Sequence, residues 1–145
     1  MSIWFKEISL EYLNQFGKNT MAEFLGIEFI EIGNDYLRAT MPVNARTQQP
    51  IGILHGGANV ALAETVASTA ANAVIDLSQF FCVGLEINAN HIRSVNKGVV
   101  TAITSPLHIG RSTHVWEVRI FNEEKKLTCI SRMTASVINH PKERG

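Results

Sequence analysis

The sequence predicts an α+β fold in which an antiparallel sheet curls around one long, buried helix. Three observations support this fold: a hairpin pattern near the start, a long apolar helical segment in the middle, and four strand-like segments after it. The chain has 145 residues, which we expect to form a single domain over residues 1–145 with a substantial hydrophobic core. Hydrophobic residues make up 46% and charged residues 18%, a balance typical of globular proteins.

The elements before the central helix are short. Leu10 to Phe16 is predicted to be a helix that ends near Gly17. Residues 27–32 and 36–43 alternate as strands and are joined by a turn-forming Gly-Asn-Asp, so they predict a hairpin. Pro42 indicates that the second strand ends there or lies at a sheet edge, because proline cannot donate a ladder hydrogen bond.

The longest predicted helix covers Gly56 to Ile75. Its apolar residues occur on all sides rather than in one stripe, so most of its surface should be buried. Many of them are alanines, which would let a sheet approach the helix closely. The four strands predicted after it are 81–92, 99–106, 114–121 and 127–138. Their connectors at 95–98 and 122–126 are short and polar, which favours antiparallel hairpins or a meander.

The overall charge excludes several classes of partner. Thirteen basic and thirteen acidic residues give a net charge of zero, which argues against a nucleic-acid or membrane-surface binder. No apolar run reaches the roughly 18 residues of a membrane span, and the N-terminus lacks a signal-peptide pattern. We therefore expect a cytoplasmic protein whose cysteines, Cys82 and Cys129, are reduced and buried.

One carboxylate is placed unusually within this balanced composition. No Lys or Arg occurs between Arg46 and Arg93, and Glu64 lies in the middle of the apolar helix. Its neighbours three and four residues away cannot form an ion pair with it. Burial without a partner would raise the pKa of Glu64 and suit it to act as a base or nucleophile. The alternative is a solvent-facing Glu64 on a narrow wet strip of the helix.

The segment before the helix offers donors for an oxyanion. His55 and Gly56-Gly57 precede the first helical turn, whose N–H groups lack helical partners and lie at the positive end of the dipole. Gln49 could donate its amide to a carbonyl, and Ser68, one turn after Glu64, could hold a water. In each case the alternative is an ordinary structural role in packing or local hydrogen bonding.

The spacing of these groups indicates a dimer. Gly56 and Glu64 are eight residues apart, roughly 12 Å along a helix. One substrate carbonyl cannot contact both within a single chain. If both act on it, they must come from two subunits whose helices run antiparallel, with sites at the interface.

Basic and hydroxyl residues that would suit phosphates follow the helix. They occur around 91–94, at Lys97, and in the 108–113 segment that we expect to join two strands. The alternative is that these residues form a solvated loop rim.

Several motifs together resemble the hotdog-fold acyl-CoA thioesterases. The run 47–58 (TQQPIGILHGGA), Leu62-Ala63-Glu64, residues 83–91 (VGLEINANH) and Arg93-Ser94 carry this resemblance, which covers nearly the whole chain. Within that family they are similar to the branch holding the menaquinone-pathway 1,4-dihydroxy-2-naphthoyl-CoA hydrolase and the enterobactin-pathway proofreading thioesterase.

The resemblance implies roles for individual residues. Glu64 would be the nucleophile or general base, and Gly56 of the opposing chain would supply the oxyanion N–H. Gln49 and His55 would orient the thioester carbonyl, and Ser68 would hold water or support the carboxylate. The coenzyme A channel would be lined by Gly84, His91, Ile92, Arg93, Ser94, His108, Ile109, Gly110, Arg111, Ser112 and Thr113.

The resemblance also implies an assembly and a reaction. Two subunits would pair into a continuous sheet, giving a homodimer, and dimers would pair into a homotetramer. The protein would hydrolyse an acyl-CoA, by analogy an aromatic one, without a metal or redox cofactor, since coenzyme A is part of the substrate. The alternatives are a hotdog-fold hydratase or dehydratase and a non-catalytic acyl-CoA binding protein.

Overall fold

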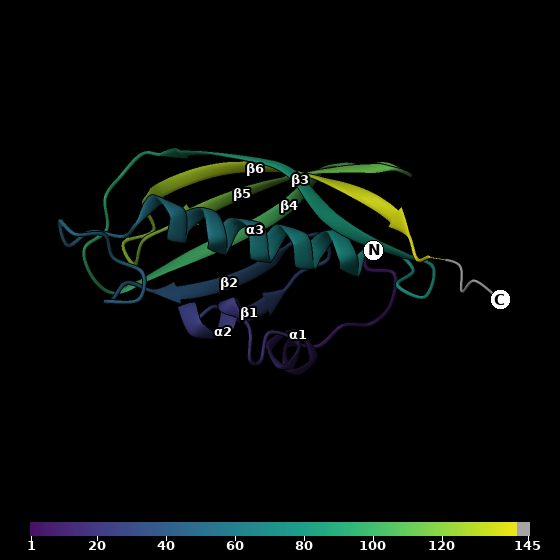
Figure 1. The fold of residues 1–145 in the computed structure, drawn as a ribbon, viewed down its shortest axis with the longest axis horizontal. Helices are drawn as coiled ribbons and strands as arrows, with labels where there is room; N and C mark the ends of the chain where they lie inside the picture. The colour runs from purple at the N-terminus through teal and green to yellow at the C-terminus, as the bar shows by residue number, and fades with distance from the viewer. Residues whose placement is uncertain (142–145) are drawn as a thin grey trace.

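A computed structural model describes residues 1–141 as one six-stranded antiparallel sheet with a long helix across one face (Figure 1). The strand order is β1-β2-β4-β5-β6-β3. This arrangement confirms the predicted α+β fold. The elements in chain order are α1 (Leu10–Phe16), α2 (Met21–Leu25), β1 (Glu28–Ile32), β2 (Leu37–Pro42), α3 (Gly56–Ala73), β3 (Phe80–His91), β4 (Val99–Ile109), β5 (Thr113–Phe121) and β6 (Leu127–Asn139).

The core lies between α3 and the concave face of the sheet. The helix contacts every strand from β2 to β6, and its alanines allow this close approach. It ends at Ala73, two residues before the predicted end. The side chains buried along it are Ala58, Asn59, Leu62, Ala63, Val66, Ala67, Ala70 and Ala71.

One side of α3 departs from the prediction of burial nearly all round. A half-buried polar strip runs along the helix. Its two threonines and its asparagine donate hydrogen bonds to carbonyls one turn earlier, which satisfies them within the helix. Of the side chains in this strip, only those of Glu64 and Ser68 have no hydrogen-bond partner among residues 1–141. The strip consists of Glu64, Thr65, Ser68, Thr69 and Asn72.

Strand pairing corrects one connection. The meander β4-β5-β6 is confirmed, with its second connection at the predicted 122–126. The hairpin predicted at 95–98 is wrong, because β3 pairs with β6 at the far edge and the chain crosses the end of the sheet to reach β4. In addition, β4 ends at Ile109 and β5 begins at Thr113. Only three residues of the predicted 108–113 loop therefore connect the two strands.

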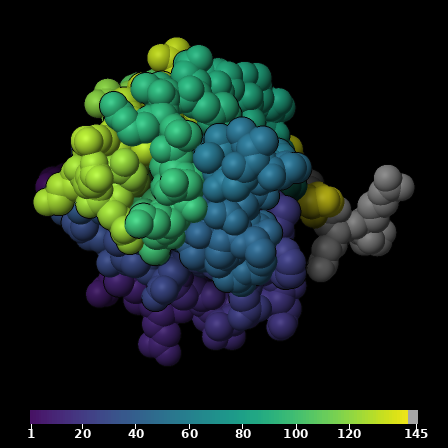
Figure 2. Space-filling view, turned by 90° about the vertical axis from the view of Figure 1, so that its left-hand side faces the viewer, coloured from purple at the N-terminus to yellow at the C-terminus, as the bar shows by residue number. Residues whose placement is uncertain are grey.

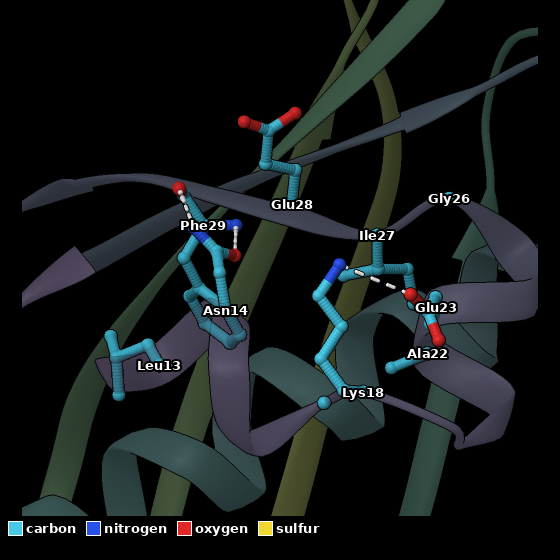
Figure 3. A pocket seen from close by; sticks show the side chains of 10 residues that line it. Leu13, Asn14, Lys18, Ala22, Glu23, Gly26, Ile27, Glu28 and Phe29 are labelled. Atoms are coloured by element: carbon cyan, nitrogen blue, oxygen red, sulfur yellow. Dashed lines mark hydrogen bonds and ion pairs between the residues drawn. The ribbon is translucent and has the colours of Figure 1, made fainter. Parts of the chain in front are cut away.

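The N-terminal helices cover the outer edge of β1. Helix α1 has the predicted bounds and is capped by Ser9, whereas α2 was not predicted. The Asn14 side chain accepts from the Phe29 N–H at 2.8 Å and donates to its carbonyl at 3.0 Å. The hollow between α1, α2 and β1 is closed in part by the Lys18–Glu23 ion pair (Figure 3). No predicted site residue lines this hollow, which lies between the two helices and the edge strand.

Both cysteines are free thiols in the core. Burial raises the pKa of Cys82 and of Cys129 to about 11, which makes them unreactive. This confirms the expectation of reduced packing residues. Within residues 1–141, no helix is long and apolar enough to cross a membrane, and no group of three His, Cys, Asp or Glu side chains could hold a metal.

Candidate active site

The start of α3 presents two unpartnered donors. His55 is the N-cap, in an extended conformation, and its Nδ1 accepts from the Gly57 N–H at 2.8 Å. Since Nδ1 accepts, the neutral ring carries its proton on Nε2, which has no acceptor in the described part of the chain. The Gly56 N–H has no partner among residues 1–141. These donors lie at the positive end of the helix dipole, where an oxyanion is stabilised.

A cavity of about 390 Å³ opens at this end of the helix. Figure 2 shows the loop before α3 (blue) beside the segment that follows β3 (green). Six predicted site residues line the cavity, so the structure brings these two distant parts of the sequence together. The six are Gln49, Gly56, His91, Ile92, Arg93 and Ser94.

The Glu64 carboxylate lies over β3, about two turns further along α3. A methyl group at Gly84 would overlap Glu64 Oε1, so only glycine leaves space for the carboxylate there. Glu64 is half-buried, forms no ion pair within residues 1–141, and has a pKa raised by burial. This confirms the expected direction of its pKa shift. Gly84, predicted to line the coenzyme A channel, lies against the catalytic candidate.

Asn72 fixes the position of β3 against the helix. Its Oδ1 accepts from the Cys82 N–H at 2.8 Å, and its Nδ2 donates to the carbonyls of Cys82 at 3.1 Å and Ser68 at 2.9 Å. Cys82 is two residues before Gly84, so these bonds hold Gly84 beneath Glu64. Sequence reasoning missed this residue, although it lies two turns after Glu64 on a similar face.

Asn59 is a second residue that sequence reasoning missed. It is only 5% exposed, lines the cavity, and its Nδ2 lies 3.4 Å from His91 Nδ1. Its Oδ1 has no hydrogen-bond partner in the described part of the chain. The available signal was an asparagine in the first turns of an otherwise apolar helix.

The predicted coenzyme A residues fall at opposite ends of the sheet. Thr113 aligns with Ser136 of β6, which pairs with Val83. Seven residues along β5, Ile120 aligns with the β6 residue that pairs with His91. At roughly 3.3 Å per residue, the β4–β5 hairpin lies about 23 Å from His91, so one chain does not bring 91–94 and 108–113 together.

The cations near the cavity remain available to a ligand. Arg93 is exposed and donates one N–H to the Leu127 carbonyl at 2.8 Å. A guanidinium has five N–H donors, so most are unused. Lys97 is exposed at the neighbouring end of the connector. This local charge could hold a phosphate although the chain as a whole is neutral.

The fold and site together define a class of enzyme. An antiparallel sheet wrapped around one helix, with a desolvated carboxylate on that helix and free donors at its start, is the arrangement of a hotdog-fold thioester hydrolase. A model of the Thioesterase superfamily matches residues 51–129, and the chain belongs to that superfamily.

Named relatives are similar over almost the whole chain. The 1,4-dihydroxy-2-naphthoyl-CoA hydrolase of Escherichia coli strain K12 is 48% identical over 94% of this chain and 99% of its own. The proofreading thioesterase EntH of Cronobacter turicensis is 45% identical over 94% and 98%. The crystal structure of a mutant thioesterase from Pseudomonas aeruginosa superposes with a TM-score of 0.95 at 45% identity, covering 96% of this chain and 100% of that one.

Proposed function

We propose that this protein hydrolyses aromatic acyl-CoA thioesters at sites shared between two copies of the chain. The observation that carries the proposal is Glu64, a desolvated carboxylate without a countercharge on the central helix. Within one chain it lies roughly 12 Å along the helix from the Gly56 N–H. An antiparallel partner helix would place the two groups on the same thioester.

The proposed reaction needs only groups that the chain carries. The thioester oxygen accepts from the partner's Gly56 N–H, with the His55 Nε2–H and the Gln49 amide orienting the carbonyl. Glu64 then removes a proton from a water held by Ser68, the hydroxide adds to the carbonyl carbon, and the C–S bond breaks. The thiolate of coenzyme A takes up the proton.

A direct attack by Glu64 is the second possible route. Its carboxylate would displace the thiolate and form an anhydride, which one water then hydrolyses. Both routes consume one water and need Glu64 ionised. Oxygen-18 supplied in the water under single turnover separates them, because only the anhydride route transfers label into the Glu64 side chain.

A hollow at the other end of α3 supports an aromatic acyl group. It has a volume of about 480 Å³ and is lined mainly by apolar side chains. Its lining includes Asn72, two turns after Glu64 on roughly the same helix face, and Ile75, just beyond the end of α3. The N-terminal part of the chain lines it with aromatic side chains, Phe5 and Tyr12, which suit a planar ring.

Coenzyme A would leave the site through the cavity beside the partner's Gly56, which an antiparallel helix would place next to Glu64. The cavity beside Gly56 is open and bordered by His91 to Ser94, where Arg93 supplies charge for a phosphate. Because the 108–113 hairpin is about 23 Å away in the same chain, it would reach the nucleotide only from another subunit.

Substitution of Glu64 tests the function. Glu64→Gln keeps the size but cannot ionise, so we expect thiol release from benzoyl-CoA to fall about 10³-fold or more. Glu28→Gln, an exposed carboxylate on β1, is the matched control and should keep wild-type turnover. Wild-type turnover in Glu64→Gln would refute the proposal. A panel of short, long and aromatic acyl-CoAs defines the acyl preference, and hydration of crotonyl-CoA without thiol release would instead support the hydratase alternative.

A further inference from the structure

Asn59 is a buried polar side chain that the proposed reaction does not yet use. It is 5% exposed, on the second turn of α3, and its Oδ1 has no partner within residues 1–141. Leaving a buried acceptor unpaired is unfavourable, and such groups in native structures call for an explanation. Its Nδ2 does have a neighbour, His91 Nδ1 at 3.4 Å, so the side chain is held through its nitrogen while its oxygen remains unpaired.

His91 lies directly against the first residue of the helix. A Cβ at Gly56 would be 2.9 Å from His91 Nε2 and 3.2 Å from Cε1. The absence of a side chain at Gly56 therefore lets the ring approach the helix start. There Nε2 lies beside Gly56, whose free N–H is the proposed oxyanion donor.

With the Asn59 amide placed as it is, its contact with the ring favours one tautomer of His91. An amide nitrogen can only donate, so at 3.4 Å from Asn59 Nδ2 the His91 Nδ1 accepts. The neutral ring then has its proton on Nε2, facing the cavity. His55 shows the same pattern, because its Nδ1 accepts from the Gly57 N–H. Both imidazoles at the helix start thus present an Nε2–H to a ligand.

We propose that Asn59 is a positioning residue that holds His91 in the Nε2–H tautomer, so that His91 becomes a further donor to the thioester oxygen at Gly56. This inference rests on the proposed function. In this tautomer a neutral imidazole would add a hydrogen bond without bringing a cation close to the Glu64 carboxylate that acts as base or nucleophile. The free Asn59 Oδ1 stays open to an N–H or O–H donor that enters the cavity.

Nitrogen-15 NMR of the histidine rings tests the tautomer without relying on activity. The signals of His91 are assigned by their loss in His91→Gln, among only five histidines. We expect the Nε2–H form in the wild-type protein and a mixture in Asn59→Ala. In Asn59→Asp the carboxylate accepts from Nδ1–H, which removes the fixed Nε2–H tautomer. Asn139→Ala, an exposed asparagine at the end of β6, is the control and should leave the ring signals unchanged.

Kinetics test what the tautomer does. Removing an oxyanion donor typically lowers kcat by 10²–10³-fold. Asn59→Ala removes only the positioning of the donor, so we expect kcat to fall about tenfold. In Asn59→Asp we expect kcat to fall about a hundredfold. KM should stay within about threefold in both variants. A role confined to structural packing would instead lower the melting temperature and leave the kcat of the folded protein unchanged.

Two replacements of His91 distinguish the roles of its two ring nitrogens. A glutamine amide nitrogen lies near the position of Nε2, whereas that of asparagine lies near Nδ1. We expect His91→Gln to keep kcat within about tenfold and His91→Asn to lose about 10²-fold. Equal activity in the two variants, or an Nδ1–H tautomer in the wild-type protein, would overturn the inference. The proposed function fails separately, if Glu64→Gln remains active.

Discussion

Glu64 shows how one residue combines a stability cost with a chemical use. Its carboxylate is half-buried with no ion pair within residues 1–141, and burial raises its pKa. Relative to the unfolded chain, folding therefore shifts Glu64 toward the neutral form, whereas both proposed routes need the charged one. At neutral pH the folded chain holds a charge that its surroundings do not stabilise, which keeps the carboxylate basic.

The raised pKa of Glu64 predicts how Glu64→Gln changes stability with pH. The folded pKa lies above the ordinary value of 4.5, so the stabilisation from the protonated form is complete below that value and is lost as pH rises through the folded pKa. Glutamine does not ionise. We expect Glu64→Gln to increase the free energy of unfolding at pH 7 by about 0.5 kcal/mol or more, and this gain to vanish near pH 4.

Urea unfolding of the two proteins between pH 4 and pH 8 measures this difference. A gain that is equally large at pH 4 would reflect packing rather than ionisation. No gain at pH 7 would mean that the carboxylate is well solvated in the folded protein.

At the scale of elements, the site depends on how α3 lies against β3. Asn72 binds both backbone groups of Cys82, and the ladder between β3 and β6 shifts register between Gly84 and Glu86. These features place a residue without a side chain directly beneath Glu64. The strand therefore acts as a support for the carboxylate as well as an edge of the sheet.

Gly84→Ala is expected to displace the Glu64 carboxylate and leave the fold intact. The added methyl would overlap Glu64 Oε1, the end of a flexible side chain that can move, and Gly84 is exposed on an edge strand. We expect kcat to fall at least tenfold, because small misplacements of reacting groups are costly, with little change in melting temperature. Gly17→Ala is the matched control, since its Cβ would meet nothing closer than 3.7 Å. Undiminished kcat in Gly84→Ala would show that the carboxylate works from another position.

Local patterns predicted most elements of this fold because local forces form them. The Ser9 cap and following Gly17 bound α1, and the glycines after His55 mark the start of α3. Helix α2 has five residues, too few for a periodic signal. The pairing of β3 with β6 was not predictable from connector length, because it joins segments almost fifty residues apart in the chain.

The candidate site was also predictable only in part from the sequence. Glu64, Gly56 and His55 stand out by charge, by flexibility and by their place at or within a helix. Asn59 and Asn72 do not stand out, because their partners lie on β3 and only the folded chain brings them together. The sequence therefore indicates the candidate reacting residues, whereas the positioning residues are recognised only from tertiary contacts.

At the scale of the whole molecule, the proposed shared site would take its two parts from different chains. The free Gly56 N–H and the Glu64 carboxylate are separated along α3, and the predicted coenzyme A residues lie at both ends of the sheet. The edge strand β3 pairs only with β6 within residues 1–141 and exposes Val83 and Leu85. An unpaired edge with apolar side chains is a surface on which a second sheet can continue.

Gly56→Pro removes the proposed oxyanion donor with little change to the helix. Proline suits the first position of a helix, where its missing N–H forms no helical bond. The preceding His55 is extended, with φ −68° and ψ 132°, as a residue before proline requires. Gly56→Ala keeps the N–H while adding a Cβ against His91, so it separates crowding from loss of the donor.

Sites shared between subunits predict that two inactive variants restore activity when they are combined. Glu64→Gln and Gly56→Pro are co-expressed with different tags, and the mixed dimers are isolated by sequential affinity steps. Each mixed dimer has one site with both defects and one site with neither, because a two-fold axis relates the two sites. We expect the mixed dimer to show about half of the wild-type kcat per dimer, although each parent is nearly inactive. If Glu64 and Gly56 of the same chain formed the site, every site would carry a defect and the mixed dimer would remain as inactive as its parents.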